Sequence, residues 1–166
     1  MYYSGITKCD IANGNGFRVV LWVSGCDHHC PGCHNPETWN PCYGKLFDVF
    51  TVLEILDALD KDYIEGLTLS GGDPLKKKNV PYVYWLVKQV KEKYPNKDIW
   101  CWTGDTLEQL ENRDDVKELL KYIDVLVDGE FIQSKRDITL AWRGSSNQKI
   151  YRNENGKFVD VTASYN

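Results

Sequence analysis

The feature that most constrains the fold is a regular alternation of short apolar segments with segments of helical periodicity. Runs rich in β-branched and aromatic residues predict strands at residues 17–23, 64–69, 99–102 and 123–127. Helices are predicted over residues 52–61 and 81–94, and over 106–122 with a break near 113–115. Such alternation with short connections implies an α/β fold, with helices covering parallel strands that are connected right-handedly. Four strands of this kind are too few for a closed eight-stranded barrel.

Turn and capping residues mark the ends of several predicted elements. Thr51 and Glu54, and likewise Thr106 and Gln109, have the spacing of a capping box at a helix start. Near the C-terminus, residues 153–156 lie between two short apolar pairs and have the composition of a tight turn. This pattern predicts a C-terminal hairpin.

Length and composition are typical of an ordinary globular protein. The 166 residues suit a single domain, which we expect to span 1–166. A net charge of −4 provides no positive field for phosphate backbones, so nucleic acid is not an expected partner. The apolar run at residues 19–23 is far shorter than the ~20 residues of a membrane helix, and no secretory signal is recognisable. We therefore expect a cytoplasmic protein that does not contact a membrane.

The most unusual local sequences follow the predicted strands. In chain order they are residues 26–33, Gly71-Gly72-Asp73, Thr103-Gly104 and Asp128-Gly129. The C-terminal ends of parallel strands meet at one edge of a sheet, where ligands commonly bind. The sequence therefore predicts a functional site at this edge.

The loop at residues 26–33 contains Cys26, Cys30 and Cys33, half of the six cysteines of the chain. Clustered cysteines in a reducing compartment more often bind metal or perform chemistry than form a disulfide scaffold. Thiolates suit iron–sulfur clusters and zinc. Structural zinc needs four ligands, whereas three thiolates on a cubic cluster would leave one iron open to a small molecule.

Spacing alone leaves three alternatives open. The cysteines could be unpaired structural residues, or they could belong to an electron-transfer cluster with four cysteine ligands. They could also form a zinc knuckle completed by a further cysteine or histidine. The candidates for that fourth ligand are Cys9, Cys42, His28, His29 and His34.

The cysteine loop, with three and then two intervening residues, resembles that of the radical S-adenosylmethionine enzymes. Further segments look like one branch of that superfamily, the activating proteins of anaerobic (class III) ribonucleotide reductase. These segments are residues 33–39 (CHNPETW), 71–74 (GGDP), 102–104 (WTG) and 142–148 (WRGSSNQ). The likeness covers about residues 9–150 and implies a partial β/α barrel of the radical S-adenosylmethionine type.

This resemblance implies that Cys26, Cys30 and Cys33 hold one [4Fe–4S] cluster per chain, whose open iron chelates S-adenosylmethionine. One-electron reduction then cleaves the sulfonium to methionine and a 5′-deoxyadenosyl radical. In the family, that radical takes a hydrogen atom from a glycine Cα of anaerobic ribonucleotide reductase. The implied partners are the large subunit of that reductase and a one-electron donor such as flavodoxin. No catalytic residue beyond the cluster and S-adenosylmethionine is expected.

The resemblance also implies where S-adenosylmethionine binds. The Gly71-Gly72-Asp73 turn would hold the methionine amino group, although many members have Glu where Asp73 stands. The superfamily commonly has an aromatic residue at the position of Gly32. The backbone at Gly32, Cys33 and His34 is therefore our assignment for the adenine edge of the pocket.

Several interpretations remain open at this point. The enzyme could activate another glycyl-radical enzyme of the pyruvate formate-lyase type, or the chain could be a zinc-binding adaptor module. A set of late polar residues could grip the partner or serve only as structural hydrogen-bonding groups. These residues are Asp128, Arg143, Asn147 and Gln148. The basic run at residues 76–78 is read as a solvated turn.

Overall fold

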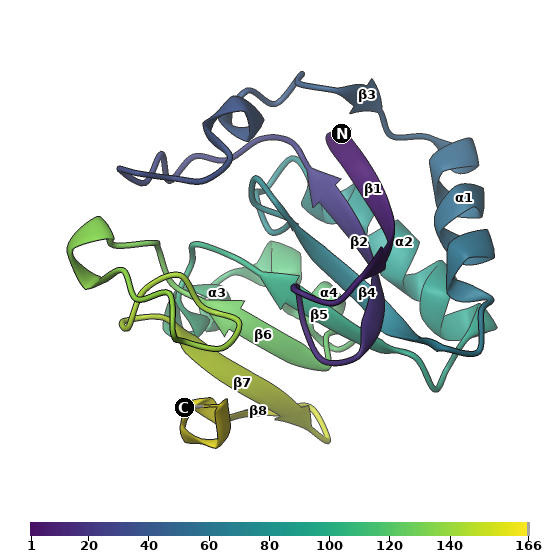
Figure 1. Cartoon of the computed structure of the whole chain (residues 1–166). Coiled ribbons are helices and arrows are strands. Elements are labelled where there is room, and N and C mark those ends of the chain that lie inside the picture. The colour runs from purple at the N-terminus through teal and green to yellow at the C-terminus, as the bar shows by residue number, and fades with distance from the viewer. Residues whose placement is uncertain (166) are drawn as a thin grey trace.

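The computed structural model describes residues 1–165, which form an eight-stranded sheet in the order β3-β1-β2-β4-β5-β6-β7-β8 (Figure 1). Its central strands are parallel: β2 (Phe17–Val23), β4 (Ile64–Gly71), β5 (Asp98–Trp102) and β6 (Val125–Asp128). The outer strands pair antiparallel: β1 (Tyr2–Asp10), β3 (Lys45–Leu46), β7 (Lys149–Glu154) and β8 (Lys157–Asp160). The predicted α/β fold, a partial barrel with a parallel core, is confirmed.

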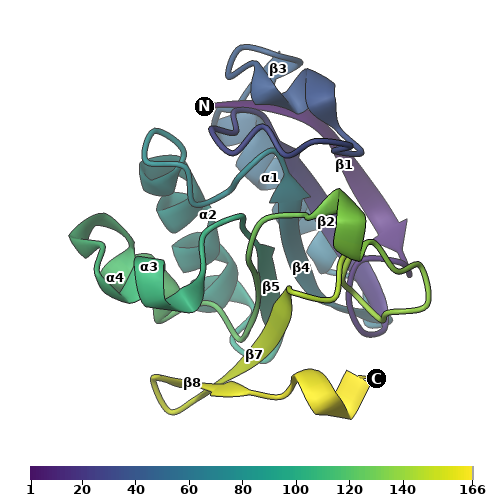
Figure 2. The same cartoon turned by 90° about the vertical axis from the view of Figure 1, so that its left-hand side faces the viewer.

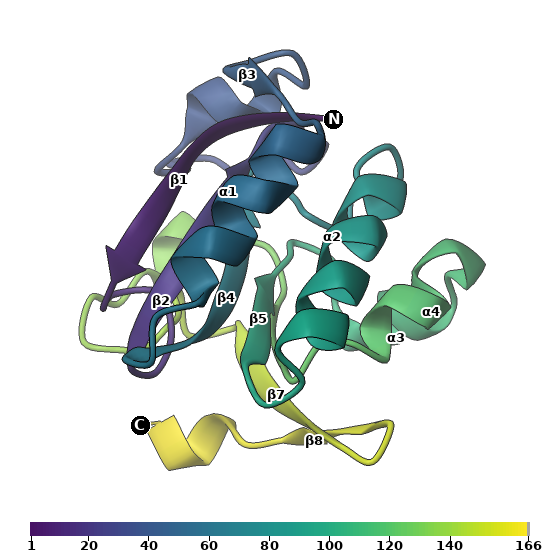
Figure 3. The same ribbon diagram turned by 90° about the vertical axis from the view of Figure 1, so that its right-hand side faces the viewer.

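The α-helices cover one face of this sheet (Figure 3). They are α1 (Val49–Leu59), α2 (Val80–Lys93), α3 (Leu107–Glu111) and α4 (Lys117–Leu120). Short 3-10 turns are η1 (Pro36–Trp39), η2 (Asp114–Val116), η3 (Gln133–Lys135) and η4 (Thr162–Tyr165). Since η2 separates α3 from α4, the predicted break near 113–115 is confirmed. Within the described residues, no helix has the length and apolar composition needed to cross a membrane.

The start of α1 corrects one prediction. The helix begins at Val49 and not at residue 52, because Asp48 is the N-cap. Its carboxylate accepts from the Thr51 amide at 3.0 Å, and the Thr51 hydroxyl accepts from the Asp48 amide at 3.3 Å. Thr51 is thus the third helical residue of a capping box and not its first member. Val49 and Phe50 are exposed, so a search for buried apolar residues misses the first turn.

The capping box from Thr106 to Gln109 is confirmed, as is the C-terminal hairpin. In the hairpin, Glu154 pairs with Lys157 across Asn155 and Gly156. These two turn residues have φ values of 54° and 89°. Left-handed backbone at both positions is the type I′ geometry that matches strand twist. Figure 2 shows the hairpin and η4 below the parallel strands.

Strand β1 was missed by the sequence analysis. Its side chains are mostly half-buried or exposed, and they show no clean two-residue alternation. Its register with β2 is also irregular between Tyr3 and Gly5 and between Thr7 and Asp10. Pairing with β2, rather than local pattern, keeps this segment extended, and the Trp22 indole donates to the Thr7 hydroxyl at 2.9 Å.

The two faces of the sheet have different cores, because successive strand residues point to opposite faces. The larger core lies between the sheet and the helices and includes Leu69 of β4 and Cys101 of β5. A smaller cluster packs Trp100, Val125, Val127 and Ile150 together. Partly buried Trp102 and Trp142 pack against this second cluster.

Arg18, at the start of β2, has a fully buried side chain. It lies 2.7 Å from the Asp98 carboxylate and donates to the Thr68 hydroxyl at 2.7 Å and to the Leu67 carbonyl at 3.0 Å. Its guanidinium also lies 5.2 Å from the centre of the Trp100 ring. Burial lowers the pKa of Arg18, and Asp98 opposes that effect. A buried cation with these partners joins β2, β4 and β5 near their N-terminal ends.

We expect Arg18→Met to lower the free energy of unfolding by about 2–3 kcal/mol, measured by urea denaturation. The loss stays below the ~3–5 kcal/mol of a fully buried pair because the Asp98 side chain is 40% exposed and its other oxygen keeps the hydrogen bond from the Trp100 indole. Arg152→Met is the matched control: Arg152 is exposed, so a change within ~0.5 kcal/mol is expected. Equal losses in the two variants would contradict a structural role for the buried cation.

Candidate functional site

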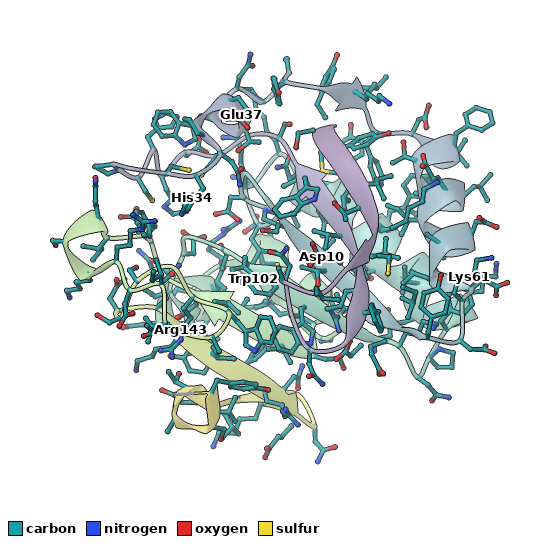
Figure 4. All side chains as sticks on the ribbon, viewed as in Figure 1. Asp10, His34, Glu37, Lys61, Trp102 and Arg143 are labelled. Carbon is teal, nitrogen blue, oxygen red and sulfur yellow. The ribbon has the colours of Figure 1, made fainter. Side chains whose placement is uncertain are left out.

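The site lies at the C-terminal ends of the parallel strands, where two long loops face each other. The cysteine loop follows β2, and the loop of residues 130–147 follows β6 (Figure 1). In Figure 4, His34 and Arg143 from these two loops lie on the same side of the molecule, and Lys61 lies at the opposite end. The chain turns that sequence analysis singled out therefore occupy one edge of the sheet.

A cavity of about 210 Å³ opens between these loops and the strand ends. The residues predicted to bind the cluster or S-adenosylmethionine that line it are Cys26, Cys30, Cys33, His34, Gly71 and Gly72. Other residues that the sequence singled out also line it, namely His28, Thr103, Gly104, Gly129 and Gln148. Further lining residues that the structure adds are the aromatic residues Trp39, Trp102 and Phe131. The structure thus brings the three clustered cysteines together with the backbone of the glycine turn.

Two predicted cofactor residues lie outside this cavity. Gly32 is exposed and faces the side chain of Gln133, which lies 2.7 Å from the position that a Cβ on Gly32 would occupy. Asp73 is 2% exposed, and its carboxylate is directed into a hydrogen-bond network behind the cavity. Gly71 and Gly72 are therefore the part of the turn that faces the cavity, with Asp73 supporting it.

The turn after β4 is joined to the base of the cysteine loop by backbone hydrogen bonds. The Gly72 amide donates to the Val23 carbonyl at 2.8 Å, and the Asp73 amide donates to the Gly25 carbonyl at 2.9 Å. Gly71 has a φ of 104°, and a Cβ there would lie 2.6 Å from the Val23 oxygen. Only glycine allows this close approach with this backbone conformation.

Backbone amides of the site point at the cysteine sulfurs. The Asn35 amide donates to the Cys33 sulfur at 3.4 Å. Backbone hydrogen bonds from His28 and His29 lower the pKa of Cys26. A backbone hydrogen bond from Phe131, in the opposite loop, lowers the pKa of Cys30. Hydrogen bonds of this kind stabilise thiolates and tune the potential of a bound iron–sulfur cluster.

The protonation of the thiols fits a metal-ligating role. Burial raises the pKa of Cys26 to about 11 and also raises the pKa of Cys30. Such thiols keep their protons at neutral pH unless a metal cation replaces them, because the charged form is poorly solvated. The set of three partly buried cysteines, with backbone hydrogen bonds to their sulfurs, therefore suits a cationic inorganic centre.

The remaining cysteines do not join this set. Cys9 and Cys42 are exposed, Cys101 is buried, and none of the three lines the cavity in the part of the chain described. Across residues 1–165, no group of three or more histidine, cysteine or acidic side chains converges tightly enough to hold a single metal ion. The sulfurs of Cys26, Cys30 and Cys33 surround a cavity instead, which suits a larger cluster better than the zinc knuckle considered above.

The three histidines occupy different environments. His28 lies between carboxylates, 3.0 Å from Asp73 and 2.8 Å from Glu130. Its hydrogen bond to Asp73, more than any other contact, raises the pKa of His28 to about 9 against the opposing effect of burial. The His29 ring packs on Trp39, and the His34 ring packs against Phe131.

The late polar residues hold the 130–147 loop together. The Gln148 side-chain oxygen accepts from the Gly144 amide at 2.9 Å, while its amide donates to the Gly129 carbonyl at 2.8 Å. Asn147 donates to the Glu130 carbonyl at 2.9 Å, and Arg143 donates to the Gln148 carbonyl at 3.4 Å. Asp128 accepts from backbone amides of Leu107 and Lys149. These contacts support the structural interpretation of the four residues.

Sequence analysis missed the aromatic residues of the cavity, Trp39, Trp102 and Phe131, as lining groups. Trp102 ends β5 and could have been placed from the predicted strand, because Thr103 and Gly104 were already expected at this edge. Phe131 had no such signal, since its position depends on how the loop after β6 folds back over Cys30. The three rings give the cavity its aromatic surface.

We expect Gly72→Ala to destabilise the fold by about 1–3 kcal/mol, because overpacking a tight contact displaces backbone. A Cβ on Gly72 would lie 2.7 Å from the Gly25 oxygen and 3.0 Å from the Thr38 oxygen. Thermal and urea unfolding measure the loss. Gly5→Ala is the control, because nothing lies within 4 Å of its added Cβ. A Gly72→Ala protein as stable as Gly5→Ala would contradict the close approach of turn and loop.

Comparisons with known proteins agree with this geometry. The model of the 4Fe-4S single cluster domain matches residues 12–151. The anaerobic ribonucleoside-triphosphate reductase-activating protein of Enterobacteria phage T4 is 47% identical over 94% of this chain and 97% of its own. The proteins of the same name from Pasteurella multocida and Escherichia coli K12 are 47% and 43% identical, over 92% and 91% of this chain and 98% of each relative. The chain therefore belongs to the family of anaerobic ribonucleoside-triphosphate reductase-activating proteins, with a single 4Fe-4S cluster domain.

Proposed function

We propose that Cys26, Cys30 and Cys33 hold the single [4Fe–4S] cluster of this radical S-adenosylmethionine activating enzyme, and that its substrate is a glycine of anaerobic ribonucleotide reductase. One observation carries the assignment of ligands. The three cysteines and the Gly71-Gly72 turn line one cavity, while Cys9, Cys42 and Cys101 lie elsewhere in the described structure. Three sulfurs leave one corner of a cubic cluster open for the amino and carboxylate groups of S-adenosylmethionine.

When bound, the reduced cluster supplies the electron that splits the sulfonium into methionine and a 5′-deoxyadenosyl radical, which abstracts hydrogen from the glycine Cα. The chain's own residues position and shield this chemistry. Gly71 and Gly72 present backbone without side chains to the cavity. Trp39, Trp102 and Phe131 provide apolar walls around it. These walls limit the access of water and of other hydrogen donors to a reactive radical.

The electron and the target both come from other proteins in this proposal. A one-electron donor of the flavodoxin type would reduce the cluster, and the reductase would present its glycine at the open side of the cavity. His34 lines the cavity and is exposed, and Ile138 on the facing loop is 84% exposed. An exposed apolar side chain on this loop supports a partner that covers the site during the reaction.

We expect Cys26→Ala, Cys30→Ala and Cys33→Ala each to abolish glycyl-radical formation and to lower the iron retained after anaerobic reconstitution. Loss of one thiolate removes a ligand that no nearby cysteine replaces. Cys42→Ser is the matched control because its side chain is exposed and away from the cavity, and Cys101→Ala should cost only about 1 kcal/mol of stability. If Cys9 or Cys42 proved equally necessary for iron, the assignment of an open iron would be wrong.

Two measurements separate this function from its alternatives. Iron, sulfide and zinc analysis of anaerobically prepared protein distinguishes a cluster enzyme from a zinc adaptor, which would be colourless and indifferent to dithionite. Electron paramagnetic resonance of the protein mixed with reductase or with pyruvate formate-lyase then identifies the substrate. A glycyl doublet with the lyase alone would contradict the proposed partner.

A further inference from the structure

His28 is the residue of the cysteine loop with the most side-chain connections to the rest of the site. Its Nε2 atom lies 3.0 Å from the Asp73 carboxylate, and its Nδ1 atom lies 2.8 Å from the Glu130 carboxylate. Asp73 belongs to the turn after β4, and Glu130 belongs to the loop after β6. One ring therefore bridges three loops that surround the cavity.

Asp73 is a rigid anchor for this ring. One of its oxygens accepts from the Leu75 amide at 2.8 Å. The other accepts from the Thr103 hydroxyl at 3.1 Å and the Gly104 amide at 3.3 Å, in addition to facing His28. Since the carboxylate is buried and bonded on both oxygens, its position is set by the backbone around it. A hydrogen bond to Asp73 therefore fixes the position of His28 relative to β4 and β5.

The His28 ring also packs tightly against Gly104. A Cβ on Gly104 would lie 2.4 Å from the Cδ2 atom of His28, so the imidazole rests directly on the backbone after β5. Gly104 does not have a positive φ, so its backbone conformation does not require glycine. Glycine is needed here because a side chain would collide with the His28 ring. Thr103 thus donates a hydrogen bond to Asp73, and Gly104 leaves room for the His28 ring that contacts the same carboxylate.

An outer layer of ion pairs reinforces the same connection. Asp27, next to His28, pairs with Lys76, whose side chain is 12% exposed, so Lys76 is not the solvated residue that the basic run predicted. Arg113, at the break between α3 and α4, contacts Asp105 at 2.5 Å and donates to the Leu75 carbonyl at 2.8 Å. The carboxylate of Asp105 lies 3.6 Å from His28. The cysteine loop is therefore tied twice to residues 73–76.

We propose that His28 is a positioning residue, which holds the cysteine loop at a fixed spacing from the Gly71-Gly72 backbone so that cluster and S-adenosylmethionine can engage together. The proposal rests on the proposed function, since it takes Cys26 and Cys30 as cluster ligands on either side of His28. His28 does not line up as a fourth ligand, because both of its ring nitrogens face carboxylates. Preorganisation of this kind lowers the cost of ordering a loop when the ligand binds.

Three substitutions at His28 test the role by separating its two contacts. His28→Ala removes both. In His28→Gln the side-chain amide reaches the place of Nε2 and can still donate to Asp73, whereas in His28→Asn it reaches only the place of Nδ1, near Glu130. Asp73 is buried and Glu130 is 55% exposed, so the Asp73 contact should matter more. Glu37→Gln is the matched control, because Glu37 is exposed on η1, just after the cysteine loop, and does not line the cavity.

The readout is the electron paramagnetic resonance spectrum of the dithionite-reduced, reconstituted full chain during titration with S-adenosylmethionine. For His28→Ala we expect iron and sulfide contents equal to those of the unmodified protein. We also expect the S-adenosylmethionine concentration for the half-maximal spectral change to rise by about 10- to 100-fold. His28→Gln should recover most of that loss, His28→Asn should resemble His28→Ala, and Glu37→Gln should resemble the unmodified protein.

Several outcomes would overturn the proposal. A His28→Ala spectrum that responds at the unmodified S-adenosylmethionine concentration would show that the ring positions nothing. Equal recovery by Gln and Asn would show that the ring only fills space. If His28→Ala does not fold, the Gln and Asn variants, which keep polar side chains, still provide the comparison. A failure of the unmodified protein to respond to S-adenosylmethionine would instead contradict the proposed function itself.

Discussion

The parallel register of β2 and β4 is the constraint on which the site depends. Val23 lies opposite Gly71 at the ends of these strands, so the cysteine loop and the glycine turn leave the sheet at the same level. The amides of Gly72 and Asp73 then bond to carbonyls of Val23 and Gly25. A side chain at Gly71 or Gly72 would collide with that backbone. Strand pairing therefore sets the spacing between the cysteine loop and the glycine turn, and side-chain contacts add to it.

The sheet does not close into a barrel, because it has only four parallel strands and antiparallel strands flank them on both sides. β1 and β7 pair with the outer parallel strands, and turn the chain back before a closed ring can form. Arg18, Thr68 and Trp100 occupy the interior toward the N-terminal strand ends. The cavity is left at the C-terminal ends, where Trp102 and the loops form its walls.

Charged residues outside the cavity also fix the positions of its loops. The α3–α4 segment is interrupted at Arg113, and the interruption lets its guanidinium contact Asp105, Asp115 and the Leu75 carbonyl. The buried carboxylate of Asp73 accepts hydrogen bonds from its own turn and from the loop after β5. Both features place charge where loops of different strands meet. Loop positions are therefore set by a connected polar network rather than by any single pair.

Local pattern was enough to predict the parallel strands, the two longer helices, the broken third helix and the Asn155-Gly156 hairpin. Each of these depends on periodicity or turn residues within a few positions, which are visible along the chain. The same reasoning missed β1, whose extended form comes from pairing with β2, and placed the start of α1 three residues late because its first turn is exposed. Elements defined by distant partners leave little trace in local composition.

The chemistry of the site divides in the same way. Three clustered cysteines and a glycine turn after a strand are local facts, so the sequence alone determined the cluster ligands to propose and the edge of the sheet where they should lie. Only the tertiary structure decided that the Asp73 carboxylate contacts His28, that the Phe131 amide bonds to Cys30, and that His28 joins loops from three strands. These contacts link residues 45 to 102 positions apart, and their geometry exists only once the parallel strands have brought their ends together.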